Sequence, residues 1–153
     1  MSDVESCGCP PTAARPAGGG VHHLIVNVSD LTRSQPFYAW LMPRLGYDGT
    51  RAYPGTLGWF GPRGSFWLKQ ADARFAGDVF SKDRLGLCEI AFGASSRAEV
   101  DALARDLASR VARILDPPRE YPYTPGYYAV FFTDPDGIKL ELVHIPGSTD
   151  KEA

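Results

Sequence analysis

The sequence has few cysteines, little net charge and no long apolar run, and each shortage excludes a class of protein. Three cysteines make an odd count, and Cys88 falls in a predicted core strand, so we expect no disulfide framework and a cytoplasmic setting. A formal net charge of -2 argues against nucleic acid or an anionic membrane as the main partner. No apolar run approaches the roughly 20 residues of a membrane span, and the N-terminus lacks a signal-peptide pattern.

Several catalytic motifs are also missing. The sequence contains no nucleophile elbow, no glycine-rich phosphate loop and no pairing of cysteine with histidine. Residues 1–20 are rich in Pro, Gly, Ala and Ser and have no apolar period, so they are predicted to be a flexible tail. Cys7 and Cys9 lie in this tail, where two thiols make only a weak site for a soft metal. Residues 146–153 are predicted to form a second, C-terminal tail.

Residues 21–145 are predicted to form a single α+β domain that repeats one pattern, strand–helix–three strands. The first module covers about 21–70, with strands at 21–28, 47–53, 57–60 and 65–70 and a helix from 29 to about 41, stopped by Pro43. A linker, 71–86, leads to the second module at about 87–145, with strands at 87–92, 112–115, 127–133 and 138–144 and a helix opening at 95–99. Two βαβββ modules must share sheet faces, because neither alone closes a core.

The sequence Asp134-Pro135-Asp136-Gly137 predicts a tight turn between the last two strands. In the strand after it, Ile138, Leu140 and Leu142 alternate with Lys139, Glu141 and Val143. A carboxylate between leucines in mid-strand costs several kcal/mol if it is buried without a partner. Glu141 therefore requires a partner.

Two other polar residues share the position of Glu141. His23, Glu89 and Glu141 each lie opposite the most apolar row of their strand, so we expect them on the concave face of the sheet, away from the helices. One imidazole and two carboxylates on one surface are a plausible ligand set for a divalent metal. The alternatives are a lone exposed histidine, a pair of Glu89 with Lys69 or Arg119, and a pair of Glu141 with Lys139.

Three segments carry a resemblance to a known family: HHLIVNVSDLTRSQPFY, EIAF and GYYAVFFTDPDGIKLELV. In this order and spacing they resemble the vicinal oxygen chelate superfamily, which includes glyoxalase I, fosfomycin-resistance thiol transferases, extradiol dioxygenases and bleomycin-binding proteins. The resemblance implies a cupped mixed sheet of two βαβββ modules and a metal held by His23 (rather than His22), Glu89 and Glu141. Trp67 stands where glyoxalase I has a fourth ligand.

The resemblance implies a divalent-metal enzyme, a lyase, isomerase or thiol transferase acting on a small oxygenated substrate chelated to the metal. Mn²⁺, Ni²⁺, Zn²⁺ or Mg²⁺ suits a ligand set of one histidine and two glutamates better than redox-active iron, and Glu89 or Glu141 is the candidate base. The alternative is a metal-free protein of the bleomycin-binding type that sequesters an aromatic ligand, and an extradiol dioxygenase is the third possibility. The resemblance to fosfomycin-resistance enzymes also implies a homodimer that pairs His23 with the partner's carboxylates.

Aromatic and basic residues supply the predicted substrate pocket. Alternation places Trp67 and Lys69 on the face of Glu141, and Tyr127 and Phe131 face the same way. A Pro- and Tyr-rich segment, 116–126, is predicted to be a loop long enough to cover the site. Its Arg119, Tyr121 and Tyr123 are expected to bind an anionic or planar substrate.

Overall fold

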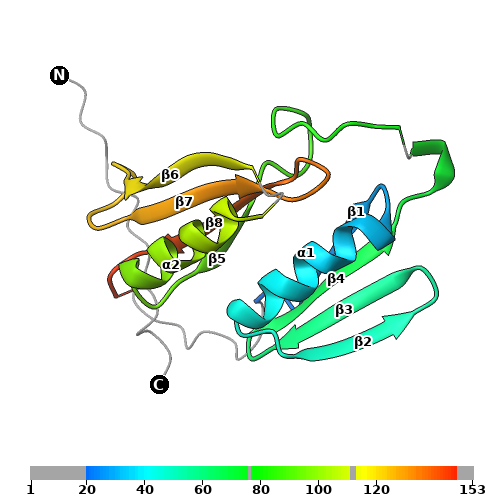
Figure 1. Ribbon diagram of the computed structural model, residues 1–153, viewed down its shortest axis with the longest axis horizontal. Coiled ribbons are helices and arrows are strands. Elements are labelled where there is room, and N and C mark those ends of the chain that lie inside the picture. Colours follow the sequence, from blue (N-terminus) through cyan, green and yellow to red (C-terminus); the bar gives the residue numbers. More distant parts are fainter. Residues whose placement is uncertain (1–19, 76, 111–112, 148–153) are drawn as a thin grey trace, which may run out of the picture.

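The repeated pattern in the sequence becomes two modules of the same kind in the structure. The computed structural model describes residues 20–75, 77–110 and 113–147; Cys7 and Cys9 lie outside them. The first module comprises β1 (His23–Val28), α1 (Leu31–Arg44), β2 (Gly49–Tyr53), β3 (Thr56–Gly61) and β4 (Gly64–Gln70) (Figure 1). The second comprises β5 (Ile90–Gly93), α2 (Arg97–Ala108), β6 (Ile114–Glu120), β7 (Tyr128–Thr133) and β8 (Lys139–His144), and a short 3₁₀ helix, Ala73–Phe75, lies in the linker. The predicted α+β class with two βαβββ modules is confirmed.

Each module forms its own four-stranded mixed sheet. The strand orders are β1-β4-β3-β2 and β5-β8-β7-β6. In both sheets the first strand pairs in parallel with the last, and the remaining pairs are antiparallel. The strand orders place β1 and β5 at sheet edges, where one side of each backbone has no ladder partner in the described chain.

The helices begin where the sequence predicts. The carboxylate of Asp30 accepts hydrogen bonds from the backbone N–H groups of Thr32 and Arg33 at the start of α1, and the hydroxyl of Ser96 accepts from the N–H of Glu99 at the start of α2. However, α1 runs through Pro36 and Pro43 to Arg44. Each proline lacks the N–H that would bond the carbonyl four residues earlier, so the helix continues without those two hydrogen bonds. Neither helix, nor any other in residues 20–75, 77–110 and 113–147, is long and apolar enough to cross a membrane.

Two strand boundaries in the second module differ from the prediction. β5 begins at Ile90, so Glu89 is the residue immediately before the strand rather than within it. β6 continues to Glu120 and takes up the first half of the predicted loop, including Pro117 and Pro118. Because β6 is an edge strand, prolines are tolerated there, and the register shifts between Ile114 and Arg119 accommodate them.

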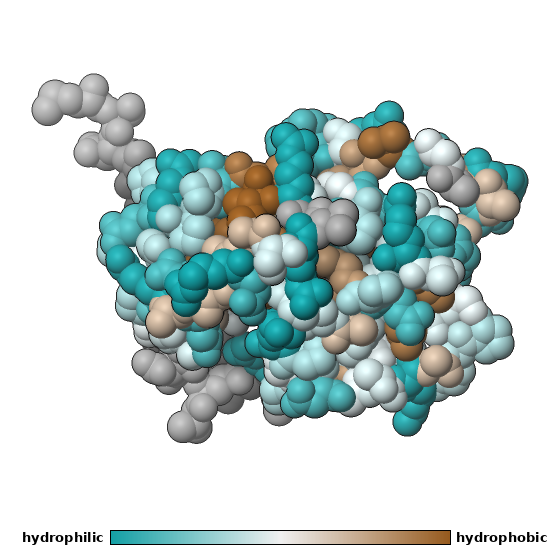
Figure 2. Space-filling model, in the orientation of Figure 1, coloured by the Kyte–Doolittle hydropathy of each residue, from teal (hydrophilic) through white to brown (hydrophobic). Residues whose placement is uncertain are grey.

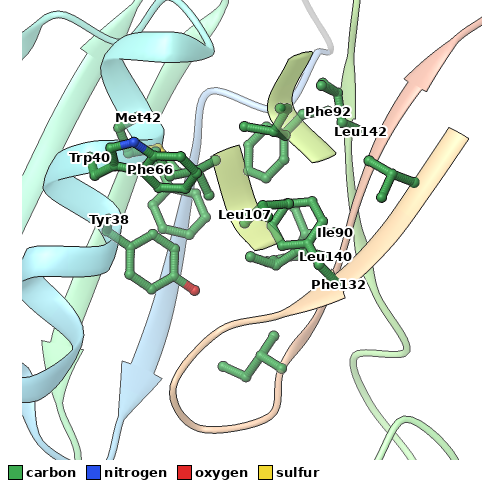
Figure 3. Close-up of a cluster of buried hydrophobic side chains, with 14 of the residues drawn as sticks. Tyr38, Trp40, Met42, Phe66, Ile90, Phe92, Leu107, Phe132, Leu140 and Leu142 are labelled. Carbon is green, nitrogen blue, oxygen red and sulfur yellow. The ribbon is translucent and has the colours of Figure 1, made fainter. Parts of the chain in front are cut away.

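The two modules share one hydrophobic core on the helix side of their sheets. Phe66 of β4 lies 6.0 Å from Phe92 of β5, and Tyr47 lies 6.4 Å from Phe92 (ring centroids). Figure 3 shows aromatic and aliphatic side chains of both modules meeting at this point. On the outer surface of this side of the molecule, Figure 2 shows mostly hydrophilic residues with small, separate apolar patches. The apolar rows of the strands therefore pack beneath the helices, as the alternation predicted.

Polar contacts also join the modules, and we call this set the inter-module clamp. The hydroxyl of Tyr38 in α1 donates to Asp134 Oδ2 at 2.9 Å. The backbone N–H and the hydroxyl of Ser29 donate to Asp136 at 2.8 and 2.6 Å, and Arg33 forms an ion pair with the same carboxylate. The Asp-Pro-Asp-Gly turn thus fastens the end of the second module to the start of α1 in the first.

Candidate functional site

Glu141 lies on the face of the second sheet that points away from the helices, which we call the outer face of the sheet. It is opposite Phe131 on β7 and Ala91 on β5, and its side chain is almost fully buried, with 1% exposed. The hydroxyl of Tyr127 donates a short hydrogen bond to its Oε1. Burial raises the pKa of the Glu141 carboxyl, the hydrogen bond from Tyr127 lowers it, and the nearby charge of Glu89 raises it again. The partner that Glu141 requires is therefore first a hydroxyl group, not a cation.

Glu89 occupies the neighbouring position on the same face. Lys139 Nζ lies 2.5 Å from Glu89 Oε2, and it also lies 4.2 Å from the centre of the Phe131 ring. The predicted alternative pairing of Glu89 with Lys69 or Arg119 is therefore wrong. The sheet brings two carboxylates and one ammonium group to one surface, so this cluster carries a net negative charge when its members are ionised.

Four of the predicted substrate-binding residues form a cluster of rings beside Glu141, namely Tyr121, Tyr123, Tyr127 and Phe131, and Arg119 contacts this cluster at Tyr121. Tyr121 packs edge-on against Phe131 with 5.2 Å between ring centroids, and it lies 6.2 Å from Tyr127. Tyr123 stacks parallel to Tyr121 at 5.7 Å, and the Arg119 guanidinium lies 4.4 Å from the Tyr121 ring centre. Arg119 belongs to β6 and pairs with Asp116 rather than lying in a loop. The result is an aromatic wall beside Glu141.

The remaining predicted residues lie on the first module. His23 is exposed, on the same face of β1 as Ile25, and its Nδ1 lies 3.0 Å from Nδ1 of His22. Lys69 is exposed on β4 and lines a groove of about 910 Å³ between β1 and the linker. Neither His22 nor His23 packs into the core.

Trp67 is the centre of a second aromatic cluster, on the outer face of the first sheet. Its ring stacks on Tyr53 at 5.9 Å and meets Phe60 edge-on at 5.3 Å, and its indole N–H donates to Ser65 Oγ at 2.9 Å. A Cβ added at Gly58 would lie 2.4 Å from the ring, so only glycine leaves room for Trp67 to lie flat on β3.

The three predicted metal ligands do not meet within one chain. Among residues 20–75, 77–110 and 113–147, no three side chains of His, Cys, Asp or Glu lie together in a way that could hold a metal ion. Glu89 and Glu141 are neighbours, whereas His23 belongs to the other sheet. Two carboxylates on one face are oxygen donors of the kind that divalent cations prefer, but no third ligand lies beside them in the described part of the chain.

Sequence reasoning missed several residues of these surfaces. Tyr53 and Phe60 lie on the face of Trp67, and the glycine in Thr56-Leu57-Gly58-Trp59 was the available signal, because glycine inside a strand marks a close approach. Lys139 was considered only as an alternative partner of Glu141, but the pairing of β5 with β8 places it beside Glu89.

Comparison with known proteins identifies the architecture. A sequence profile of the Glyoxalase/Bleomycin resistance protein/Dioxygenase superfamily matches residues 20–142. The chain belongs to this superfamily. The vicinal oxygen chelate resemblance found in the sequence is thereby confirmed, and the two four-stranded sheets described above are the βαβββ modules of the glyoxalase-like fold.

Relatives within the superfamily are similar in sequence or in fold. The chain is 35% identical over 125 residues to the uncharacterized protein YqjT of Bacillus subtilis (strain 168), covering 80% of this chain and 97% of that protein. A Bacillus halodurans crystal structure described as a "putative glyoxalase" superposes with a TM-score of 0.74 at 34% identity, covering 81% and 94% of the two chains. A lactoylglutathione lyase from Agrobacterium tumefaciens shares the fold, with a TM-score of 0.60 at 20% identity, over 86% and 96%.

Proposed function

We propose that the protein is a divalent-metal-dependent enzyme of the glyoxalase type, a lyase, isomerase or thiol transferase that acts on a small oxygenated substrate in the cytoplasm. One observation carries the proposal: two carboxylates, Glu89 and Glu141, share one sheet face, and Glu141 is buried to 1% exposure with a second negative charge beside it. A buried carboxylate is costly for stability, so its presence in a cluster of this kind favours a functional role.

His23, Glu89 and Glu141 are the residues that would hold the metal. One nitrogen and two carboxylate donors suit Mn²⁺, Ni²⁺, Zn²⁺ or Mg²⁺. When bound, the metal supplies Lewis-acid stabilisation of an enediolate or a leaving alkoxide. The chain supplies a carboxylate base from Glu89 or Glu141, a hydroxyl of Tyr127 that orients Glu141, and an aromatic wall that binds the substrate and excludes water.

A second copy of the chain would supply the missing histidine, in a homodimer. The inter-module clamp and the shared core fix how the two modules of one chain sit, and the faces that carry the ligands lie opposite that core. Exposed apolar side chains also gather near the open edge of β1, in β1 and in the linker, which is typical of an interface. They are Ile25, Phe75, Val79, Leu85 and Leu87.

Complementation between variants tests the site and its assembly together. His23→Ala and Glu141→Gln chains carrying different tags are co-expressed, and the heterodimer is isolated and its metal measured by mass spectrometry. If the partner supplies the histidine, each variant alone binds no metal and the heterodimer regains one intact site. A wild-type protein without divalent metal after growth in Mn²⁺, Ni²⁺ and Zn²⁺ would contradict the metal-dependent function. A heterodimer as empty as its parents would contradict the shared site alone.

The contacts of the carboxylates favour one alternative, a metal-free protein that binds an aromatic ligand. Lys139 already pairs with Glu89, Tyr127 already donates to Glu141, and stacked tyrosines lie beside them. Quenching of tyrosine fluorescence by an aromatic ligand, equal in EDTA and in Mn²⁺, would support this binder over the enzyme. The donor set of one histidine and two glutamates departs from the two-histidine, one-carboxylate set of iron oxygenases, so a dioxygenase is not proposed.

A further inference from the structure

Lys139 forms an ion pair with Glu89, and its positive charge also acts on the carboxyl of Glu141, whose pKa it lowers. Its side chain is 22% exposed and that of Glu89 is 33% exposed, so the pair is partly shielded from water. The ring of Phe131 lies under the ammonium group at 4.2 Å, which is within the range of a cation–π interaction. Glu141, two residues along the same strand, adds a second negative charge within reach of the ammonium.

This arrangement differs from the surface pairs elsewhere in the described chain. Lys82 and Asp83, for example, are 51% and 78% exposed and lie in the linker, where solvent screens their attraction. The ammonium of Lys139 instead lies between an aromatic ring and a carboxylate, beside a buried second carboxylate. In this position a single positive charge offsets part of the repulsion between Glu89 and Glu141.

We propose that Lys139 is an internal counter-cation that competes with the divalent metal for Glu89. The inference rests on the proposed function and concerns the regulation of that same site. An ammonium group and a dication both require the oxygens of Glu89, and both are favoured by the charge of Glu141. Metal entry therefore requires the lysine to release the carboxylate, which its flexible four-carbon stem permits. Lys139 keeps the metal-free site stable and lowers its affinity for divalent cations.

The test measures metal affinity rather than activity. EDTA-stripped wild type, Lys139→Met, Lys139→Gln and Lys139→Arg are titrated with Mn²⁺ by calorimetry at low ionic strength. We expect the two neutral variants to bind Mn²⁺ at least about tenfold more tightly, because one repelling charge and one competitor are removed. The arginine variant keeps the charge and should stay within about threefold of wild type. Lys82→Met breaks an exposed pair with the same substitution and should leave the Kd unchanged.

Thermal melting of the same proteins gives a second readout. In EDTA the neutral variants should melt at lower temperature than wild type, since their carboxylates repel without a counter-cation, and Mn²⁺ should raise their melting temperature more than it raises that of wild type. Unchanged or weaker Mn²⁺ binding by both neutral variants, with normal binding by wild type, would overturn the competition and leave the metal site standing. Absence of binding by every protein in the series would refute the metal-dependent function and the competition with it.

Discussion

At the scale of single residues, the buried carboxyl of Glu141 controls the charge of the candidate site. Burial raises the pKa of its carboxyl, so the folded protein holds that proton more tightly than the unfolded chain does. For an acid with a raised pKa, protonation favours the fold, and the ionised group lowers stability once the pH exceeds its folded pKa. Tyr127 limits this effect because its hydroxyl donates to the carboxylate.

The charge of Glu141 can be removed while its shape is kept. We expect Glu141→Gln to be as stable as wild type or more stable in EDTA at neutral pH, because the amide oxygen still accepts from Tyr127 and the buried charge is gone. Mn²⁺ should raise the melting temperature of wild type and leave the variant unchanged. Glu120→Gln, an exposed carboxylate paired with Arg97, serves as the control. A parent indifferent to both EDTA and Mn²⁺, with a destabilised glutamine variant, would assign Glu141 a structural role instead.

At the scale of elements, the turn between β7 and β8 contains the most strongly buried acid of the clamp. Asp134 is 4% exposed, and its Oδ1 accepts from the backbone N–H groups of Asp136 and Ile138 at 2.9 and 2.8 Å. Burial raises the pKa of Asp134 to about 6, although the hydrogen bonds from Ile138 and Tyr38 act in the opposite direction. Burial therefore raises the pKa of Asp134 by more than its hydrogen-bond donors lower it.

The raised pKa predicts a pH dependence of stability. Because the folded pKa lies above the unfolded value, the contribution of Asp134 is fully present below about pH 4 and is lost as the pH rises through about 6. The loss amounts to about 3 kcal/mol. Asp134→Asn should flatten this part of the curve of unfolding free energy against pH, measured with urea between pH 4 and 7.5. Asp83→Asn, at an exposed position, should leave the curve unchanged; a wild-type slope retained in Asp134→Asn would contradict the assignment.

Alternation along the strands could be predicted from the sequence, whereas partners across strands could not. The apolar rows of β1, β4 and β8 pack toward the helices as expected, because side-chain direction depends only on local geometry. The pair of Lys139 with Glu89 forms because β5 lies beside β8, and the local sequences of β5 and β8 do not reveal that they are neighbours. Strand β6 was missed because Pro117 and Pro118 are typical of loops, and only its position at the sheet edge admits them.

At the scale of the whole molecule, the two modules are expected to unfold as one unit. They share a continuous core, and Phe92 of the second module contacts Tyr47 and Phe66 of the first. All three tryptophans of the sequence, residues 40, 59 and 67, lie in the first module, and Trp40 also meets Arg110 of the second at 4.3 Å, so their fluorescence reports on the first module and on its contact with the second. Far-ultraviolet circular dichroism reports on both.

Urea unfolding followed by the two probes should give coincident transitions. Phe92→Ala should lower the free energy of unfolding by about 3 kcal/mol, since it removes a large side chain from the shared core. Both urea midpoints should therefore move to lower concentration together. Leu115→Ala, in the second module and partly exposed, is the control and should have a small effect. A fluorescence transition that precedes or follows the dichroism transition would show two independent units instead.

The inter-module clamp has a consequence for how such proteins are recognised. The Ser-Asp-Leu segment, the Phe-Tyr pair in α1 and the Asp-Pro-Asp-Gly turn carry much of the resemblance to the superfamily, and they contribute Ser29, Tyr38, Asp134 and Asp136 to the contact between modules. Similarity at these positions therefore reports on how the two modules are held together, not on the chemistry of the site. A relative can share the inter-module clamp and still differ at the positions of His23, Glu89 and Trp67. Similarity at the clamp alone therefore does not distinguish an enzyme from a binding protein.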